Sequence, residues 1–159
     1  MRSINYVAAT TSPAGGPEVA GRVSISQVVD ETLDLPAHLS AVSDAAAGAT
    51  VSFSGVVRDH DDGRGVTELE YHGHPTAASV VAEVAAEIAA RDGVIAVAVS
   101  HRIGLLRVGD VALAAAVSAA HRREAFSACS DLVDEVKRRL PVWKRQVFTD
   151  GSDEWVGTA

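Results

Sequence analysis

Segments with strand periodicity and segments with helix periodicity follow one another in this chain without a regular β–α repeat. Apolar and polar residues alternate in the predicted strands, and apolar residues recur every three or four positions in the predicted helices. The predicted strands are Arg22–Val29, Ala49–Arg58, Val66–His72, Val94–Arg102, Asp110–Ser118 and Val142–Phe148, and the predicted helices are Pro36–Ala47, Thr76–Arg91 and a long one from Ser118 to about Leu140. This order favours an α+β fold with a mixed or antiparallel sheet and about three helices.

The long predicted helix has the clearest start, apolar stripe and stop. Ser118 is predicted to cap its first turn, and Pro141 ends it because proline lacks an amide donor and restricts the residue before it. Its apolar stripe is predicted to consist of Phe126, Cys129, Leu132, Val133, Val136 and Leu140. We expect the only cysteine of the chain to be a buried thiol on that stripe. Residues 59–65 and 104–109 are predicted as a loop and a turn region, and DGSDEW (150–155) as a turn into a short tail.

Composition restricts the class of protein. A chain of 159 residues is long enough for one domain with its own core, and we predict a flexible leader over residues 1–21 and a single domain over residues 22–159. The longest uncharged apolar run, Val111–Ala120, has ten residues, whereas a membrane span needs about 20. No signal peptide is recognisable, so we expect a cytoplasmic protein. A net charge of -7 argues against nucleic-acid binding.

The segment KRRLPVWKRQ, residues 137–146, contains five of the fourteen lysines and arginines. Lys137 falls in the last turn of the long predicted helix and Lys144 in the strand after Pro141, so a bend there could bring both amines to one pocket. The residues alone leave two interpretations open. Cations at a helix C-terminus are favoured by the helix dipole without any further role. A lysine beside large apolar side chains, in contrast, loses solvation and can serve as a base or nucleophile.

Further cationic candidates stand at the ends of predicted elements. Arg58 ends a strand, and His121 and Arg122 fall in the first turn of the long helix, where backbone amides already favour anions. Each of them alone is more simply a surface residue. The loop RDHDDGRG, followed by His72 and His74, has metal-ligating residue types but no tight ligand spacing, and it also fits an ordinary turn. Nucleotide-binding signatures are absent as well, so we expect no metal and no cofactor.

Several motifs occur together and in one order. They are FSGVVR (53–58), SHRIGLLRVGD (100–110), SAAHRREAF (118–126), KRRLPVWKRQ (137–146) and the closing DEW (153–155). In these motifs the chain resembles the large, catalytic subunit of molybdopterin synthase, the MoaE family, from about Ala49 to Val156. The match before residue 49 is weak, and YHGHPTAAS (71–79) departs from the family pattern at His74 and Ala77.

The resemblance implies an α+β fold with a hammerhead-like arrangement of strands. It implies a sulfurtransferase that converts a pterin phosphate, cyclic pyranopterin monophosphate (precursor Z), to molybdopterin in molybdenum cofactor biosynthesis. The sulfur would come from the thiocarboxylated C-terminus of a small ubiquitin-like subunit. The implied assembly is a homodimer of large subunits within a heterotetramer.

The resemblance also implies roles for the residues that match its motifs. Lys137 and Lys144 match two active-site lysines, one for proton transfer at the reacting carbon and one for stabilising the thiocarboxylate and the tetrahedral intermediate, in either order. The implied substrate-binding residues are Phe53, Arg58, His121 and Arg122, and the candidates for contact with the partner's tail are Arg138 and Arg145. A second class of function stays open, a module that binds a phosphorylated metabolite or a partner's tail without turnover. In that case arginine at either lysine position would keep function, because only the charge matters.

Overall fold

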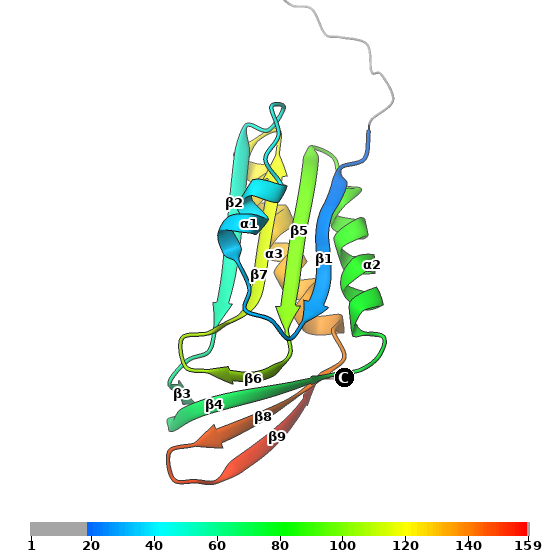
Figure 1. Cartoon of the computed structure of the whole chain (residues 1–159). Coiled ribbons are helices and arrows are strands. Elements are labelled where there is room, and N and C mark those ends of the chain that lie inside the picture. Colours follow the sequence, from blue (N-terminus) through cyan, green and yellow to red (C-terminus); the bar gives the residue numbers. More distant parts are fainter. Residues whose placement is uncertain (1–18, 159) are drawn as a thin grey trace, which may run out of the picture.

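A four-stranded mixed sheet forms the body of the molecule in the computed structural model, which describes residues 19–158. Its strands lie in the order β1 (Arg22–Val29), β5 (Val94–Arg102), β7 (Val111–Ala119) and β2 (Ala49–Val56). Strands β1 and β5 run parallel, and the other two pairs are antiparallel (Figure 1). The central strands β5 and β7 are buried on both faces, which explains their almost continuous apolar sequence.

Helices cover both faces of this sheet. The short α1 (Leu35–Ala41) lies on one face, where the small side chains of Ala96, Ala98 and Ala116 pack around Val42. The longer α2 (Ala77–Ala89) and α3 (Arg122–Arg139) cover the other face and form the main core with the sheet. Alanine and valine fill most of this core, so its tight packing depends on close approach of the backbones.

A second sheet lies across the lower end of the first (Figure 1). It contains β3 (His60–Asp61), β4 (Arg64–Gly73), β8 (Val142–Phe148) and β9 (Asp153–Thr158) in that order, and β6 (Gly104–Arg107) also pairs with β4. The predicted α+β fold with mixed and antiparallel sheets is confirmed, and three helices are present within residues 19–158. The two sheets in this arrangement give the hammerhead-like shape that the resemblance implies.

The predicted start of the long helix is wrong. Ser118 is completely buried in β7, and α3 begins at Arg122 after His121, whose side chain makes no capping hydrogen bond. The strand pattern of the preceding alanines and valines runs through Ser118, so that residue belongs to the sheet. On the stripe of α3, five of the six predicted residues are buried, including the Cys129 thiol, whose pKa burial raises to about 11. Phe126 is the exception, because its side chain is 63% exposed.

The first helix is shorter than predicted and ends at Ala41 instead of Ala47. Asp44 explains the difference: its carboxylate accepts a hydrogen bond from the Ala46 amide at 2.9 Å and pairs with Arg22 at 2.6 Å. These contacts favour a turn in place of another helical turn. Gly48 follows this turn and lies close to the Ala120 carbonyl, where a Cβ would approach the oxygen to 2.3 Å.

Three segments predicted as loop, turn and tail contain strands. Asp62 and Gly63 both have positive φ, at 47° and 76°, and form a tight hairpin turn between β3 and β4. Residues 104–107 form β6, and residues 153–158 form β9, which pairs with β8. Their hydrogen-bond partners lie far away in the sequence, and the local residue pattern does not show them.

Residues 1–18, which make up most of the predicted leader, lie outside the described residues. Within the part that the structure describes, no helix is both long and apolar enough to cross a membrane.

Candidate active site

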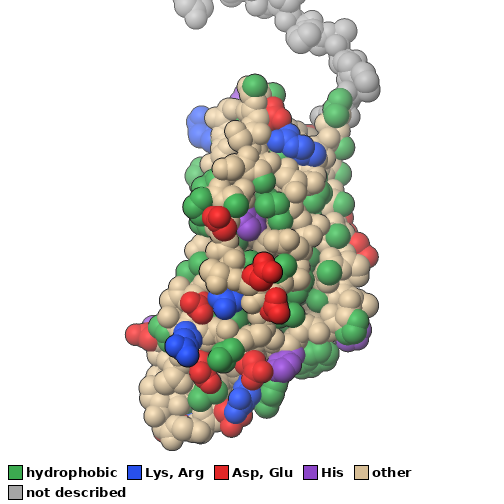
Figure 2. Space-filling view, viewed as in Figure 1, with side chains coloured by type: hydrophobic (Ala, Val, Ile, Leu, Met, Phe, Trp, Pro, Cys, Tyr) green, Lys and Arg blue, Asp and Glu red, His purple; other side chains and the backbone are tan. Residues whose placement is uncertain are grey.

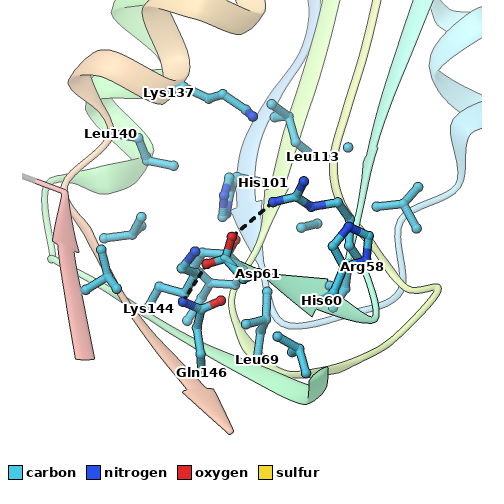
Figure 3. A pocket seen from close by; sticks show the side chains of 18 residues that line it. Arg58, His60, Asp61, Leu69, His101, Leu113, Lys137, Leu140, Lys144 and Gln146 are labelled. Carbon is cyan, nitrogen blue, oxygen red and sulfur yellow. Dashed lines mark hydrogen bonds and ion pairs between the residues drawn. The ribbon is translucent and has the colours of Figure 1, made fainter. Parts of the chain in front are cut away.

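A cavity of about 340 Å³ lies where the two sheets and the end of α3 meet (Figure 3). Apolar side chains form much of its wall, among them Val57, Val66, Leu69, Leu113, Leu140 and Val142. The polar and charged groups in its lining are Arg58, His60, Asp61, Tyr71, His101, Lys137, Lys144 and Gln146. An apolar wall with a few convergent polar groups is typical of a small-molecule site.

The two lysines of the chain both line this cavity. Lys137 lies in the last turn of α3, and Lys144 lies in β8, on the far side of Pro141. At Leu140 the backbone leaves the helix with φ -67° and ψ 116°, so the chain turns from helix to strand within one residue. Figure 3 shows both side chains directed toward the cavity. Strand alternation places Lys144 and Gln146 on the cavity side and exposes Trp143 on the opposite face.

The three arginines of the same segment do not line the cavity, and each pairs with a carboxylate. Arg138 binds Glu135 at 2.6 Å within α3, Arg139 binds Glu87 of α2 at 2.7 Å, and Arg145 binds Asp153 of β9 at 2.9 Å. Within the described residues, neither lysine forms an ion pair with a carboxylate. The basic residues of segment 137–146 therefore differ in role: its arginines pair with carboxylates of helices and strands, whereas its lysines remain available to a ligand.

Arg58 stands just beyond the end of β2 and also lines the cavity. Its Nη2 donates to Oδ1 of Asp61 at 3.1 Å, and Oδ2 of Asp61 accepts from Nε2 of Gln146 at 2.9 Å. The Gln146 hydrogen bond, followed by the charges of Lys144 and Arg58, lowers the pKa of Asp61 below its ordinary value. The sequence alone gave no reason to select Asp61, since RDHDDGRG fits a turn or a weak metal motif equally well.

His101 is a second cavity residue that the sequence did not single out. It lies near the end of β5, is only 8% exposed, and meets the Tyr71 ring edge-on at 5.1 Å between centroids. Burial, assisted by the nearby Lys137 charge, lowers the pKa of His101 to about 4, so the imidazole is neutral near pH 7. Its Nδ1 is buried without a hydrogen-bond partner. The motif SHRIGLLRVGD contains His101, but a motif alone does not show which way a side chain points.

Three residues predicted to bind substrate lie away from this cavity. Phe53 is in the middle of β2 and packs against the main core. His121 and Arg122 stand at the N-terminus of α3. Fifteen residues separate Arg122 from Lys137, which corresponds to about 22 Å along a helix axis. The length of α3 therefore keeps His121 and Arg122 away from the cavity of their own chain, and the substrate-binding role of all three residues stays a prediction.

The segments that were ambiguous in the sequence have structural explanations. Among the described residues no group of three or more histidine, cysteine, aspartate or glutamate side chains is arranged to hold a metal ion. RDHDDGRG forms the β3–β4 hairpin, and His60 pairs with Asp59 there at 2.6 Å. At the departure YHGHPTAAS, Tyr71 lines the cavity, whereas His74 and Ala77 do not. His74 lies instead beside the exposed Trp143, at 6.3 Å between rings.

Comparison with known families decides the relationship. The family described as MoaE protein matches residues 28–139. The chain belongs to the MoaE family. A molybdopterin synthase catalytic subunit from Nostoc sp. is 43% identical to it over 115 residues, which cover 71% of this chain and 70% of the relative. Another from Pyrococcus abyssi is 41% identical over 127 residues, covering 79% of this chain and 85% of the relative. The family predicted from the motifs is thus confirmed, and this MoaE chain is a molybdopterin synthase catalytic subunit of molybdenum cofactor biosynthesis.

Solved structures support the fold assignment. Molybdopterin synthase from Staphylococcus aureus matches with a TM-score of 0.75 at 31% identity, over 82% of this chain and 95% of that one. A MoaE protein from Burkholderia ambifaria matches with a TM-score of 0.70 at 30% identity, over 87% and 90%. A complex of subunits 1 and 2 of molybdopterin-converting factor from Helicobacter pylori matches with a TM-score of 0.65 over 82% of this chain and 88% of that one. At 17% identity, this last match shows likeness of fold alone.

Proposed function

We propose that this MoaE chain transfers sulfur to precursor Z from the thiocarboxylated C-terminus of a small ubiquitin-like subunit. One observation carries the proposal: both lysines of the chain line one cavity, and neither is neutralised by a carboxylate ion pair among the described residues. The relatives named molybdopterin synthase catalytic subunit support it. The Helicobacter pylori protein of similar fold occurs in a complex with a second subunit, which supports a partner of that kind.

The cavity offers separate environments for the two parts of a pterin phosphate. Its apolar wall suits the flat ring system, and the Arg58 guanidinium suits the phosphate because it can donate two parallel hydrogen bonds. In the proposed reaction the thiocarboxylate sulfur bonds to a pterin carbon as a carbon–oxygen bond of the substrate breaks, which leaves the sulfur linked to the acyl carbon of the small subunit. Water then adds to that acyl carbon to form a tetrahedral intermediate with negative charge on oxygen. Its collapse breaks the acyl carbon–sulfur bond, so the sulfur stays on the pterin and the small subunit leaves with a carboxylate. A cation fixed beside that oxygen stabilises the developing charge.

The two lysines divide this work in the proposed mechanism. Lys144 is half-buried on β8 and stabilises the thiocarboxylate and the intermediate. Lys137 is exposed at the end of α3 and can exchange a proton with water while it serves the reacting carbon as acid or base. The proposal includes the opposite assignment, in which Lys137 stabilises the intermediate and Lys144 transfers the proton. Arg138 and Arg145 stay candidates for contact with the partner's tail.

The face of the molecule drawn in Figure 2 has no basic surface of the kind that binds nucleic acid. On the face drawn in Figure 2, acidic and basic side chains are interspersed over the second sheet. Nucleic-acid binding requires clustered positive charge. The cationic groups of the cavity are better suited to a small anion, as expected from the acidic balance of the chain.

A single-turnover assay tests the proposal. The full chain is mixed with thiocarboxylated small subunit and precursor Z, and formation of the dithiolene product is followed. We expect Lys137→Arg and Lys144→Arg each to slow product formation about 100-fold or more. At position 137 a guanidinium keeps the charge but cannot transfer a proton, and at position 144 the larger planar group does not place its charge where the compact ammonium lies. Arg139→Lys is the matched control. It lies two residues from Lys137, pairs with Glu87 and should retain wild-type activity.

Each result of this assay has a defined meaning. Wild-type activity in both lysine variants would mean that the lysines act only through their positive charge, and it would contradict catalysis by their amines. Absence of product even for the wild type, with a matched partner, would favour the non-catalytic binding module. Circular dichroism of every variant confirms that a loss of activity does not reflect unfolding.

A further inference from the structure

The carboxylate of Asp61 lies among the cations of the cavity (Figure 3). It accepts one hydrogen bond from Arg58 at 3.1 Å and one from Gln146 at 2.9 Å. A negative charge at this place repels an anionic substrate, and nothing in the proposed mechanism requires it. Its presence in the cavity therefore needs an explanation.

Asp61 changes the charge that a ligand meets. The lining contains three permanent cations, Arg58, Lys137 and Lys144, and one carboxylate, so with histidines counted as neutral its net charge is +2 instead of +3. The surrounding hydrogen bond and positive charges keep the Asp61 carboxyl ionised at neutral pH. Two unit charges on the ligands, one on a cyclic phosphate diester and one on a thiocarboxylate, would balance this cavity.

The two partners of Asp61 are held very differently. Gln146 is 4% exposed in the middle of β8, and the tight turn at Asp62 and Gly63 fixes the hairpin that carries Asp61. The Arg58 side chain, in contrast, is 66% exposed. An exposed ion pair of this kind is typically worth no more than about 1 kcal/mol. Arg58 is thus free to move to a competing anion, while Asp61 stays in place.

We propose that Asp61 is a specificity-determining residue, a fixed internal counter-anion that holds Arg58 in the empty cavity and opposes the binding of a lone small anion. The inference rests on the proposed function, since it assumes that the cavity receives two anionic groups together. A single phosphate must compete with Asp61 for Arg58, so it gains little binding free energy from that arginine. A substrate that also uses the apolar wall, bound together with the partner's anionic tail, overcomes that competition. Such an unfavourable element is a common source of selectivity.

Titration of the full chain with inorganic phosphate, followed by NMR chemical shifts, tests this role without any turnover. We expect Asp61→Asn to bind phosphate about tenfold more tightly than the wild type, because one repulsive charge is lost and Arg58 is released. The asparagine carbonyl can still accept from Gln146, so the hairpin should keep its conformation. The binding of phosphate by the variant should also weaken more steeply as salt is added.

Asp59→Asn is the matched control for the charge itself. Asp59 lies on the same segment but does not line the cavity, and its side chain is 77% exposed and pairs with His60. The control removes the same charge and should change phosphate affinity less than about twofold, because solvent screens that carboxylate.

The inference is overturned if Asp61→Asn binds phosphate no more tightly than the wild type, or if both variants gain affinity equally. A weaker affinity in Asp61→Asn would mean that Asp61 only positions Arg58. Should Asp61→Asn fail to fold by circular dichroism, Asp61→Ser removes the same charge and is judged by the same criterion. Because phosphate binding needs neither precursor Z nor a partner, loss of the synthase reaction and loss of the Asp61 effect are separate results.

Discussion

At the level of single residues, the burial of His101 makes the stability of the fold depend on pH. Its folded pKa of about 4 lies below the ordinary value of 6.5, so between these values the unfolded chain binds more protons. Stability is complete above about pH 6.5 and falls as the pH drops toward 4. From these two pKa values, the free energy of unfolding should decrease by about 2 kcal/mol between about pH 7 and pH 5.

Urea denaturation at both pH values measures this effect. His101→Gln should remove most of the difference, because the amide cannot be protonated and needs no buried charge. His121→Gln is the control, since His121 is exposed and its side chain makes no capping hydrogen bond. A wild-type pH dependence that survives in His101→Gln would show that another group causes it. The carboxyl groups whose pKa is lowered begin from ordinary values of 3.8 to 4.5 and contribute mainly below this window.

At the level of elements, α3 provides a prediction about its two faces. Leu132 is completely buried against the main sheet, so Leu132→Ala should lower the free energy of unfolding by about 2–5 kcal/mol. Phe126 was predicted on the same stripe but is 63% exposed, so Phe126→Ala should change that free energy by no more than about 0.5 kcal/mol. Equal destabilisation by the two variants in urea titrations would mean that Phe126 is covered in solution.

Elements whose pattern is local could be predicted from the sequence, and those defined by distant partners could not. The strand at Val94–Arg102 was predicted with its observed bounds because its own residues show its burial. In contrast, β6 and β9 owe their conformation to pairing with β4 and β8, which the alternation of their residues does not reveal. The start of α3 was misplaced because Ser118 has the chemistry of a helix cap but the burial of a sheet residue.

The candidate site follows the same division. Lys137, Lys144 and Arg58 could be selected from composition and motif, and the structure brings them to one cavity. Asp61 and His101 could not, because their importance comes from what they face once two sheets have met. In the sequence, Asp61 and His101 have ordinary neighbours. Only the folded arrangement places Asp61 beside two cations and lowers the pKa of His101 by burial.

At the level of the whole molecule, the length of α3 makes a prediction about assembly. Arg122 and Lys137 lie about 22 Å apart along the helix, so one chain cannot bring both to one substrate. If Arg122 binds substrate, it must do so at the cavity of a second copy in the predicted homodimer. Lys137→Ala and Arg122→Ala would then each be inactive alone. A mixed dimer of the two would contain one cavity with both defects and one intact cavity.

Mixing the two variants in equal amounts, under conditions that allow subunit exchange, should restore activity. Half of randomly formed dimers are mixed, and each has one intact site of two, so about a quarter of wild-type activity should return. Lys137→Ala mixed with Lys144→Ala is the control. Both lysines line the cavity of the same chain, so every site in that mixture keeps a defect and no activity should return. Recovery in the control mixture would contradict a single-chain lysine pair. Absence of recovery in the first mixture, with exchange demonstrated by mass spectrometry, would remove Arg122 from the substrate site.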